Sequence, residues 1–444
     1  MKIALVNTLG NNKNTSYIHH GIAYIIQYAN LHNEKVDFID LRKFSWKEFK
    51  AIIKCYDLVG YSVVSTDYYR AIKAISINRK VNSDVTIVVG GIDPSTDSDK
   101  YMKNLDIDHV VAGEGEISFF KIIQAKKENK KLEKLILGER IENLDELGFI
   151  NRDIFPEEKV FPEEKVIIDP LHPPRRRFSI FLSRGCLYNC KYCQPVSKNI
   201  FGRKLRVRSP EHVIKEIVYL RNKYGLEYFQ FLDDDAFQSK EWITRFISCY
   251  KSLNFRVKFM LHVRADNIIK HEDLIRELQE LGLIMVFVGF ESGSNKMLKE
   301  FNKGTTVEKN EHAISILNKY KIQTIGSLMS GFPQETKDDM KLTLNFIKNN
   351  NNVLLQIFTY IPYPGTMLFK EYKEKGLLYN IENPDASSWK PKIKGVNYYR
   401  VVYLIFKSKF KYSFKPRLWQ FLTLISHFFK ITIFYISTLF KKFD

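Results

Sequence analysis

Residues 181–195 read FLSRGCLYNCKYCQP and hold three of the five cysteines in the chain. Cys186, Cys190 and Cys193 follow a C-x3-C-x2-C spacing, and thiolates this close in sequence can converge on one soft metal centre. A tetrahedral zinc ion requires a fourth ligand, and the neighbouring sequence offers none. The spacing suits a four-iron cluster in which one iron lacks a protein ligand; a zinc site or a chance grouping of cysteines is the alternative.

The sequence around and after this stretch alternates short apolar runs with amphipathic segments. Ser209-Pro210-Glu211 is typical of a helix start, and Gly225 of the end of that helix. Right-handed strand–helix repeats curl into a partial barrel, whose functional groups lie at the carboxyl ends of the strands. We therefore predict a partial (β/α)6 barrel over residues 178–380, with strands at 178–182, 228–233, 257–264, 284–290, 323–329 and 354–360.

The first part of the chain predicts a separate α/β domain over residues 1–135. Helical patterns at 17–32 and 67–80 alternate with apolar, β-branched runs, which indicates a doubly wound, Rossmann-like parallel sheet. No G-x-G-x-x-G follows the first run, and its absence disfavours a dinucleotide site. The predicted strands are 2–8, 36–40, 57–65, 85–91 and 109–116.

The cysteine spacing, with Tyr192 just before the last cysteine, closely resembles the radical S-adenosylmethionine (SAM) family. The resemblance implies that the three cysteines hold three irons of a 4Fe–4S cluster and that SAM chelates the fourth. It also implies that the acids after the second barrel strand receive the SAM amino group and that the stretch after the fourth contacts its ribose and carboxylate. Arg264 is a plausible carboxylate partner. The expected cofactor contacts are Tyr192, Asp233, Asp234, Arg264, Glu291 and Ser292.

Two glycine-rich motifs in the first domain, 90–95 (GGIDPS) and 111–116 (VAGEGE), resemble the cobalamin-binding domain that precedes many radical SAM domains. One motif of cobalamin proteins, D-x-H-x-x-G, is absent, so we expect no histidine on cobalt. A scaffold that has lost cobalamin is the alternative. The expected cobalamin contacts are Gly90, Gly91, Asp93, Gly113, Glu114, Gly115 and Glu116.

The resemblance implies an enzyme that cleaves SAM reductively and methylates an unactivated carbon with the help of cobalamin. A radical cyclase, rearrangement or oxidation enzyme of the same architecture is one alternative, and a non-catalytic iron–sulfur or cobalamin sensor is another. An electron donor such as flavodoxin or ferredoxin is the expected partner, and the substrate is a small or lipid-like molecule. The sequence singles out no catalytic residue.

The net charge of +19 is concentrated at the end of the chain. From Pro391 onward eleven Lys and Arg face one acid, Asp444. Residues 136–177 are expected to be a linker and 381–444 a helical tail, whose run 418–440 is almost long enough to span a bilayer. This tail fits a lid over the barrel mouth, a peripheral membrane helix or, least of all, a nucleic-acid surface. No signal peptide is recognisable, and the cluster indicates a reducing cytoplasm, with membrane association through the tail as an option.

Three further residue groups receive a structural interpretation. His19 and His20 are adjacent, point in different directions on a helix and are expected to be a polar surface pair. Cys55 lies among apolar residues and is expected to be a small core residue. Cys249 lies in an apolar helix, where we expect a buried structural thiol.

Overall fold

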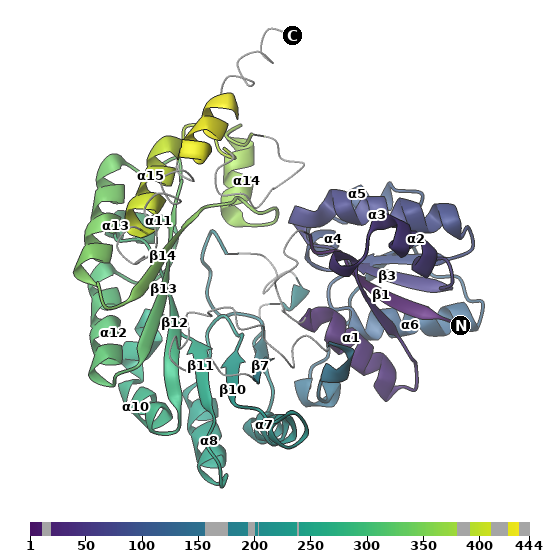
Figure 1. Cartoon of the computed structure of the whole chain (residues 1–444), viewed down its shortest axis with the longest axis horizontal. Helices are drawn as coiled ribbons and strands as arrows, with labels where there is room; N and C mark the ends of the chain where they lie inside the picture. The colour runs from purple at the N-terminus through teal and green to yellow at the C-terminus, as the bar shows by residue number, and fades with distance from the viewer. Residues whose placement is uncertain are drawn as a thin grey trace. The chain divides into compact units, whose positions relative to one another are not determined.

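The computed structural model describes residues 1–10, 19–155, 176–193, 200–202, 204–237, 239–379, 391–409 and 425–434 (Figure 1). The chain forms two compact units: Met1–Phe178, Leu182–Leu187 and Gln194–Tyr228 make up the first, and Ser179–Phe181, Tyr188–Cys193 and Phe229–Asp444 the second. The cysteine stretch therefore contributes to both. Because the units interleave along the chain, the domain boundaries expected at residues 135, 177 and 380 stay a prediction. Residues 156–175 of the expected linker and most of the run 418–440 lie outside the described residues.

The first unit contains a six-stranded parallel sheet in the order β2-β1-β3-β4-β5-β6. Ala4 of β1 pairs with Asp37 of β2, and Ile3 pairs with Leu58 of β3. All five predicted strands are present, and a short sixth strand follows them at the edge of the sheet. The strands are β1 Ile3–Asn7, β2 Asp37–Asp40, β3 Leu58–Ser62, β4 Thr86–Gly90, β5 His109–Ala112 and β6 Leu135–Leu137.

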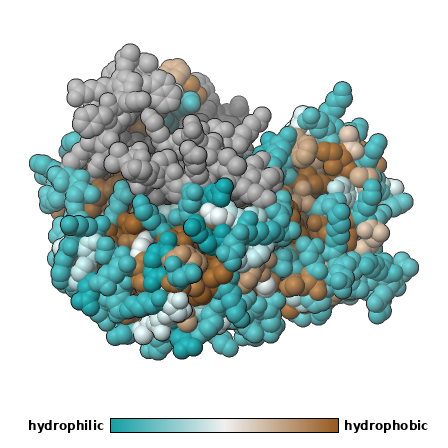
Figure 2. All heavy atoms as spheres, turned by 60° about the horizontal axis from the view of Figure 1, so that its bottom comes forward, coloured by the Kyte–Doolittle hydropathy of each residue, from teal (hydrophilic) through white to brown (hydrophobic). Residues whose placement is uncertain are grey.

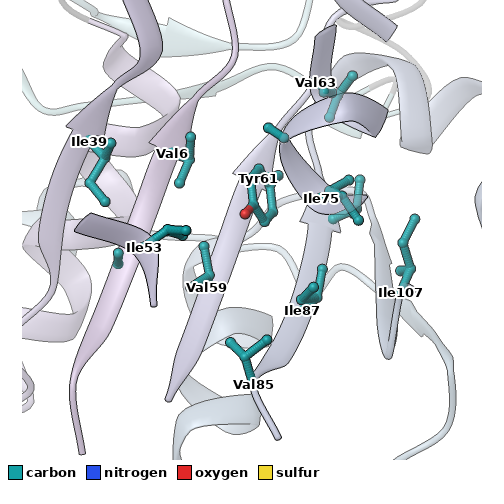
Figure 3. Packing of buried hydrophobic residues seen from close by; sticks show 14 of the residues in the cluster. Val6, Ile39, Ile53, Val59, Tyr61, Val63, Ile75, Val85, Ile87 and Ile107 are labelled. Atoms are coloured by element: carbon teal, nitrogen blue, oxygen red, sulfur yellow. The ribbon is translucent and has the colours of Figure 1, made fainter. Parts of the chain in front are cut away.

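Helices cover both faces of this sheet, because alternate residues of each buried strand point to opposite sides. Val6, Val59 and Ile87 belong to one apolar cluster together with α2 (Trp46–Ile53) and α3 (Tyr68–Val81), as Figure 3 shows in part. Their strand neighbours, such as Leu5 and Val88, pack instead with α1 and α6. The predicted doubly wound sheet is confirmed. The other helices of this part are α1 His20–Leu31, η1 Leu41–Lys43, η2 Ser65–Asp67, α4 Ile92–Thr96, α5 Asp99–Met102, α6 Glu116–Lys127, η3 Leu144–Leu147 and η4 Arg152–Ile154.

The second large sheet is a partial barrel of six strands in the order β14-β13-β12-β11-β10-β7. Strands that follow one another along the chain are neighbours in this sheet, and β11, β12, β13 and β14 pair in parallel. Figure 1 shows the sheet curving, with α8, α10, α12 and α13 along its outer side. All six predicted strands are confirmed: β7 Arg177–Ile180, β10 Tyr228–Phe231, β11 Lys258–His262, β12 Leu283–Glu291, β13 Gln323–Ser330 and β14 Leu354–Thr359.

Local capping chemistry sets the bounds of several helices. The Ser209 hydroxyl accepts a hydrogen bond from the His212 N–H, Pro210 opens α7, and Gly225 ends it with a φ of 68°. Thr336 and Asp339 form the capping box that opens α13. The helices from α7 onward are α7 Pro210–Tyr224, α8 Lys240–Lys251, α9 Ala265–Lys270, α10 Glu272–Glu280, α11 Asn295–Glu300, α12 Val307–Lys319, α13 Lys337–Asn349, α14 Met367–Glu374 and α15 Tyr398–Lys409.

The described part of the tail contains two helical segments. The first, α15, packs against β14 and α13, and buries Tyr398, Val401 and Leu404. The second spans residues 425–434. Among the helices that the structure describes, none is both long enough and apolar enough to cross a bilayer. On the coloured part of the face in Figure 2, hydrophilic residues predominate, with smaller hydrophobic areas between them.

Candidate functional site

The two glycine-rich motifs of the first unit lie side by side at the carboxyl edge of its sheet. The Ser95 hydroxyl donates to the Gly91 carbonyl over 2.6 Å and accepts from the Gly113 N–H over 3.0 Å. Gly91 has a φ of +108°, and a Cβ there would lie 2.8 Å from the Val63 carbonyl oxygen. The chain itself therefore requires glycine at this position, and the predicted juxtaposition of the two motifs is present.

Asp93 is a buried carboxylate with partners inside the first unit. It accepts a hydrogen bond of 2.6 Å from the Ser65 hydroxyl and a second hydrogen bond from the Tyr101 hydroxyl. It also forms an ion pair with Lys100. Burial, followed by the negative charge of Asp93, raises the pKa of Tyr101, so the phenol stays protonated and donates. Asp93 thus holds the segment after β4 in place, and these partners occupy its carboxylate.

Glu114 and Glu116 are also buried, and both pair with arginines. These arginines belong to the antiparallel strand pair at residues 183–184 and 206–207, here called the cysteine hairpin. Arg184 pairs with each of the two carboxylates, and Arg206 pairs with Glu114. Arg184 and Arg206 face each other across the antiparallel pair β8 (Ser183–Arg184) and β9 (Arg206–Val207). The sequence analysis predicted a role for neither arginine, although Arg184 lies within the cysteine stretch at residues 181–195.

His19 lies at the same carboxyl edge, and the expectation of a polar surface pair is wrong. Its Nδ1 accepts the Ile22 N–H over 3.2 Å and caps α1, while Nε2 lies 3.1 Å from the Ser62 hydroxyl. Burial lowers the pKa of His19 to about 4, so the ring is neutral and carries its proton on Nε2. His20 is buried. Both rings are therefore parts of the packed first unit.

In the second unit, residues 188–193 of the cysteine stretch pack against Arg264, the second residue after β11. The Arg264 guanidinium lies 3.7 Å from the centre of the Tyr188 ring, and its Nη1 lies 3.8 Å from the Cys190 sulfur. The same side chain pairs with Asp266 over 3.0 Å and donates to the Lys303 carbonyl over 2.5 Å. Arg264 thus sets a positive charge beside a predicted iron ligand.

Glu291, at the end of β12, joins Tyr192 and Lys303 in a buried cluster. Its Oε1 accepts from the Tyr192 hydroxyl over 2.9 Å and from the Lys303 ammonium over 3.0 Å. Glu291 has a φ of 65°, which an ordinary residue adopts at a cost of about 1–3 kcal/mol. Burial, then the charge of Glu291, raises the pKa of Tyr192 well above its ordinary value. The sequence carried no signal for Lys303, which lies between two helices.

The acids after β10 differ in their surroundings. Asp233 is buried and Asp234 is exposed. Asp235, which is not among the predicted cofactor contacts, accepts from the Asn267 amide over 2.6 Å, and the same amide donates to the Tyr188 hydroxyl over 2.9 Å. Burial raises the pKa of Asp235. These contacts tie the cysteine stretch to the ends of β10 and β11.

Ser292 is buried behind the end of β12. Its hydroxyl accepts the Ser294 N–H over 3.1 Å and lies 3.5 Å from the Thr343 hydroxyl of α13. Ser292 thus supports the turn after Glu291, and its role as a cofactor contact stays a prediction.

None of the five cysteines, all of which lie in the described residues, is in a disulfide. Cys186 and Cys190 are half-buried and Cys193 is exposed. No three His, Cys, Asp or Glu side chains are gathered as a metal site in the part of the chain that the structure describes. The donor set, three thiols within eight residues beside a guanidinium, fits iron–sulfur ligation. Cys249 is half-buried, and the exposed Cys55 is not the core residue expected.

Two family models match the chain, one after the other. Residues 9–122 match the B12 binding domain, and residues 180–347 match the Radical SAM superfamily. These domains imply a 4Fe–4S cluster and SAM for the second match and cobalamin for the first, in agreement with the expected cofactors.

Two curated relatives resemble most of the chain. An uncharacterized methyltransferase of Pyrococcus horikoshii is 27% identical over 79% of this chain and 77% of its own length. An anaerobic magnesium-protoporphyrin IX monomethyl ester cyclase of Rubrivivax gelatinosus is 26% identical over 73% of this chain, which spans 60% of that protein.

Two solved structures share the fold. The radical SAM methyltransferase TsrM of Kitasatospora setae, with tryptophan and a SAM analogue bound, has a TM-score of 0.65 at 17% identity and covers 84% of this chain and 76% of its own. The cobalamin-dependent radical SAM enzyme OxsB has a TM-score of 0.65 at 19% identity and covers 92% of this chain and 61% of its own. These two solved structures show that the fold is shared, and the two domain matches show that a B12-binding domain precedes a radical SAM domain in this chain.

Proposed function

We propose that the protein cleaves SAM reductively at a 4Fe–4S cluster held by Cys186, Cys190 and Cys193, and that it methylates an unactivated carbon with cobalamin. The observation that supports this most is the contact of the cysteine stretch with Arg264 and Glu291, at the carboxyl ends of two neighbouring barrel strands. When bound, the cluster and SAM supply a carbon-centred radical, and cobalamin supplies a methyl group.

The side chains of the second unit have distinct roles in this proposal. Arg264 holds positive charge at the Cys190 sulfur. Lys303 and Tyr192 hold the Glu291 carboxylate in one orientation, in which it would contact the ribose of a bound SAM. Asp233 and Asp234, after β10, receive the SAM ammonium group, for which a carboxylate is the matching partner.

In the first unit, four of the predicted cobalamin contacts are glycines. The backbone of Gly90, Gly91, Gly113 and Gly115 lies at the carboxyl edge, where ligands of doubly wound sheets bind. The neutral His19, with its proton on Nε2 and that atom beside Ser62, is not poised as a metal ligand. This arrangement supports cobalamin binding without a histidine on cobalt.

The test is anaerobic reconstitution with iron, sulfide and hydroxocobalamin, followed by incubation with SAM, a reductant and cell extract. We expect 5′-deoxyadenosine, S-adenosylhomocysteine and a product heavier by one methyl group in mass spectrometry. Cys190→Ala should abolish SAM cleavage and Cys249→Ala should retain it, since only the first removes a predicted ligand. Loss of the cluster in Cys249→Ala would contradict the ligand assignment.

A radical cyclase, rearrangement or oxidation is the second candidate, because one relative is named as a cyclase. It predicts 5′-deoxyadenosine without S-adenosylhomocysteine and without added methyl mass. A non-catalytic sensor predicts no SAM cleavage with retained binding of a partner. The same mass spectra therefore separate all three.

The proposed partners are a flavodoxin or ferredoxin as electron donor, a small or lipid-like substrate, and an anionic membrane surface. Ile425, Phe429 and Ile433 support the last, because they lie four residues apart on one helix and are 48%, 67% and 50% exposed. The eleven Lys and Arg from Pro391 onward supply the matching charge. Packing of α15 on β14 and α13 supports a structural role for the first part of the tail. Nucleic acid is not the partner proposed, and the location is the cytoplasm.

A further inference from the structure

We propose that Glu114 and Glu116 are positioning residues, which tie the segment leading into Cys186 to the cobalamin-binding loop. Cobalamin in the first domain would then order this segment for cluster assembly. The inference rests on the proposed function, because it takes the ligand of the loop to be cobalamin and Cys186 to be an iron ligand.

The first step of the argument is the geometry around Glu114, whose side chain is fully buried. Its Oε2 accepts from the Arg184 Nη1 over 2.7 Å and from the Arg206 Nη1 over 3.2 Å, and its Oε1 accepts from the Arg206 Nη2. Arg206 also donates to the Ile141 carbonyl over 2.5 Å. One carboxylate thus holds two guanidinium groups that come from both strands of the cysteine hairpin.

The second step is that the hairpin needs these acids. The β8–β9 ladder contains two residue pairs, and in one of them Arg184 lies directly opposite Arg206. Like charges across an antiparallel pair repel each other, and a ladder this short is marginal by itself. Glu116, in the first turn of α6, adds a second carboxylate to Arg184, whose guanidinium also lies 5.4 Å from the centre of the Tyr24 ring.

The third step connects the acids to the cobalamin edge. Glu114 and Glu116 flank Gly115 in the same motif whose Gly113 N–H bonds to Ser95. The Gly138 backbone packs closely against this loop, since a Cβ at Gly138 would lie 2.4 Å from the Glu114 nitrogen. A ligand seated on the loop therefore restrains backbone that carries both acids.

The last step runs from the acids to the cluster ligand. Arg184 is two residues before Cys186 and is separated from it by Gly185, whose φ of +101° turns the chain there. A Cβ on Gly185 would lie 3.0 Å from the Lys204 carbonyl, so the turn is closely packed. The position of Arg184 consequently restricts the position of Cys186. Coupling of this kind is reciprocal: a cluster that fixes Cys186 also favours the cobalamin-bound loop.

The test uses the holoenzyme and compares Glu116→Gln with the control Glu139→Gln. Glu116→Gln keeps the size and shape of the side chain and removes one negative charge beside Arg184. Arg184 keeps its ion pair with Glu114 in this variant. Glu139 is an exposed acid of the same unit and pairs with Lys121. Hydroxocobalamin affinity is measured with and without the assembled 4Fe–4S cluster, and hydrogen exchange of the 182–187 peptide is measured with and without hydroxocobalamin.

We expect the cluster to tighten hydroxocobalamin binding by about fivefold or more in the wild type and in Glu139→Gln. Hydroxocobalamin should also slow exchange of the 182–187 peptide in both. Glu116→Gln should lose most of both effects at an unchanged iron content. Arg184→Lys should lose them in part, since lysine keeps the positive charge but cannot bind two carboxylates as a guanidinium does.

Equal coupling in Glu116→Gln and the wild type would overturn the inference, as would a wild type that cleaves SAM and binds hydroxocobalamin with no coupling. Both results would leave the proposed function standing. A wild type with a full cluster that binds no hydroxocobalamin would contradict the proposed function and the inference together.

Discussion

Replacing Lys303 by methionine should destabilise the second unit, because it leaves the Glu291 carboxylate buried without its cation. The Lys303 Nζ and the Glu291 Oε1 lie 3.0 Å apart, and both side chains are 9% exposed. At that distance, with an effective dielectric constant of about 20, their attraction is about 5 kcal/mol, offset in part by the cost of removing both charges from water. Breaking such a buried pair from one side costs about 3–5 kcal/mol.

We therefore expect Lys303→Met to lower the free energy of unfolding by about 3 kcal/mol in anaerobic urea titrations followed by circular dichroism. Lys299→Met is the matched control, since Lys299 is an exposed lysine four residues earlier and should change stability by less than about 0.5 kcal/mol. The double variant Lys303→Met/Glu291→Gln should recover part of the loss, because it leaves no unpaired charge. Additive single losses, or equal stability of Lys303→Met and Lys299→Met, would refute this reasoning.

Three more predictions follow from charges and exposed surfaces. Arg264→Gln removes a cation 3.8 Å from the Cys190 sulfur and should lower the midpoint potential of the cluster by on the order of 50 mV in a titration followed by electron paramagnetic resonance; an unchanged potential would contradict this. Burial raises the pKa of Glu335 to about 7 from 4.5, so its contribution to stability is present below pH 4.5 and is lost as the pH rises through 7. Glu335→Gln should accordingly flatten the fall in unfolding free energy between pH 5 and 8 by up to about 1.4 kcal/mol per pH unit, and equal slopes would be evidence against it. Phe429→Glu should weaken salt-sensitive binding to anionic liposomes while Leu137→Glu, at a 73% exposed position of the first unit, does not, and equal binding of the two variants would argue against membrane contact.

The elements of this protein follow from local patterns in its sequence. Ser209, Pro210 and Gly225 act within one helix, and Thr336 caps the helix that it precedes, so their effects are readable from neighbouring residues alone. The parallel sheets follow in the same way, since alternation of strands with helices leaves few ways to bury both faces. The cysteine spacing and the two glycine-rich motifs are likewise contiguous in the chain.

The partners of the buried charges were decided only by the tertiary structure. Glu114 pairs with Arg206, which is 92 residues away in the sequence, and Tyr192 donates to Glu291, which is 99 residues away. No periodicity or motif connects two side chains over such sequence separations. Burial then decides the chemistry, because a charge removed from water must have a counter-charge that only the packed chain can bring to it. The sequence by itself thus determined the strands, the helix caps and the motif positions, and the fold determined which acids are bound by arginine or lysine.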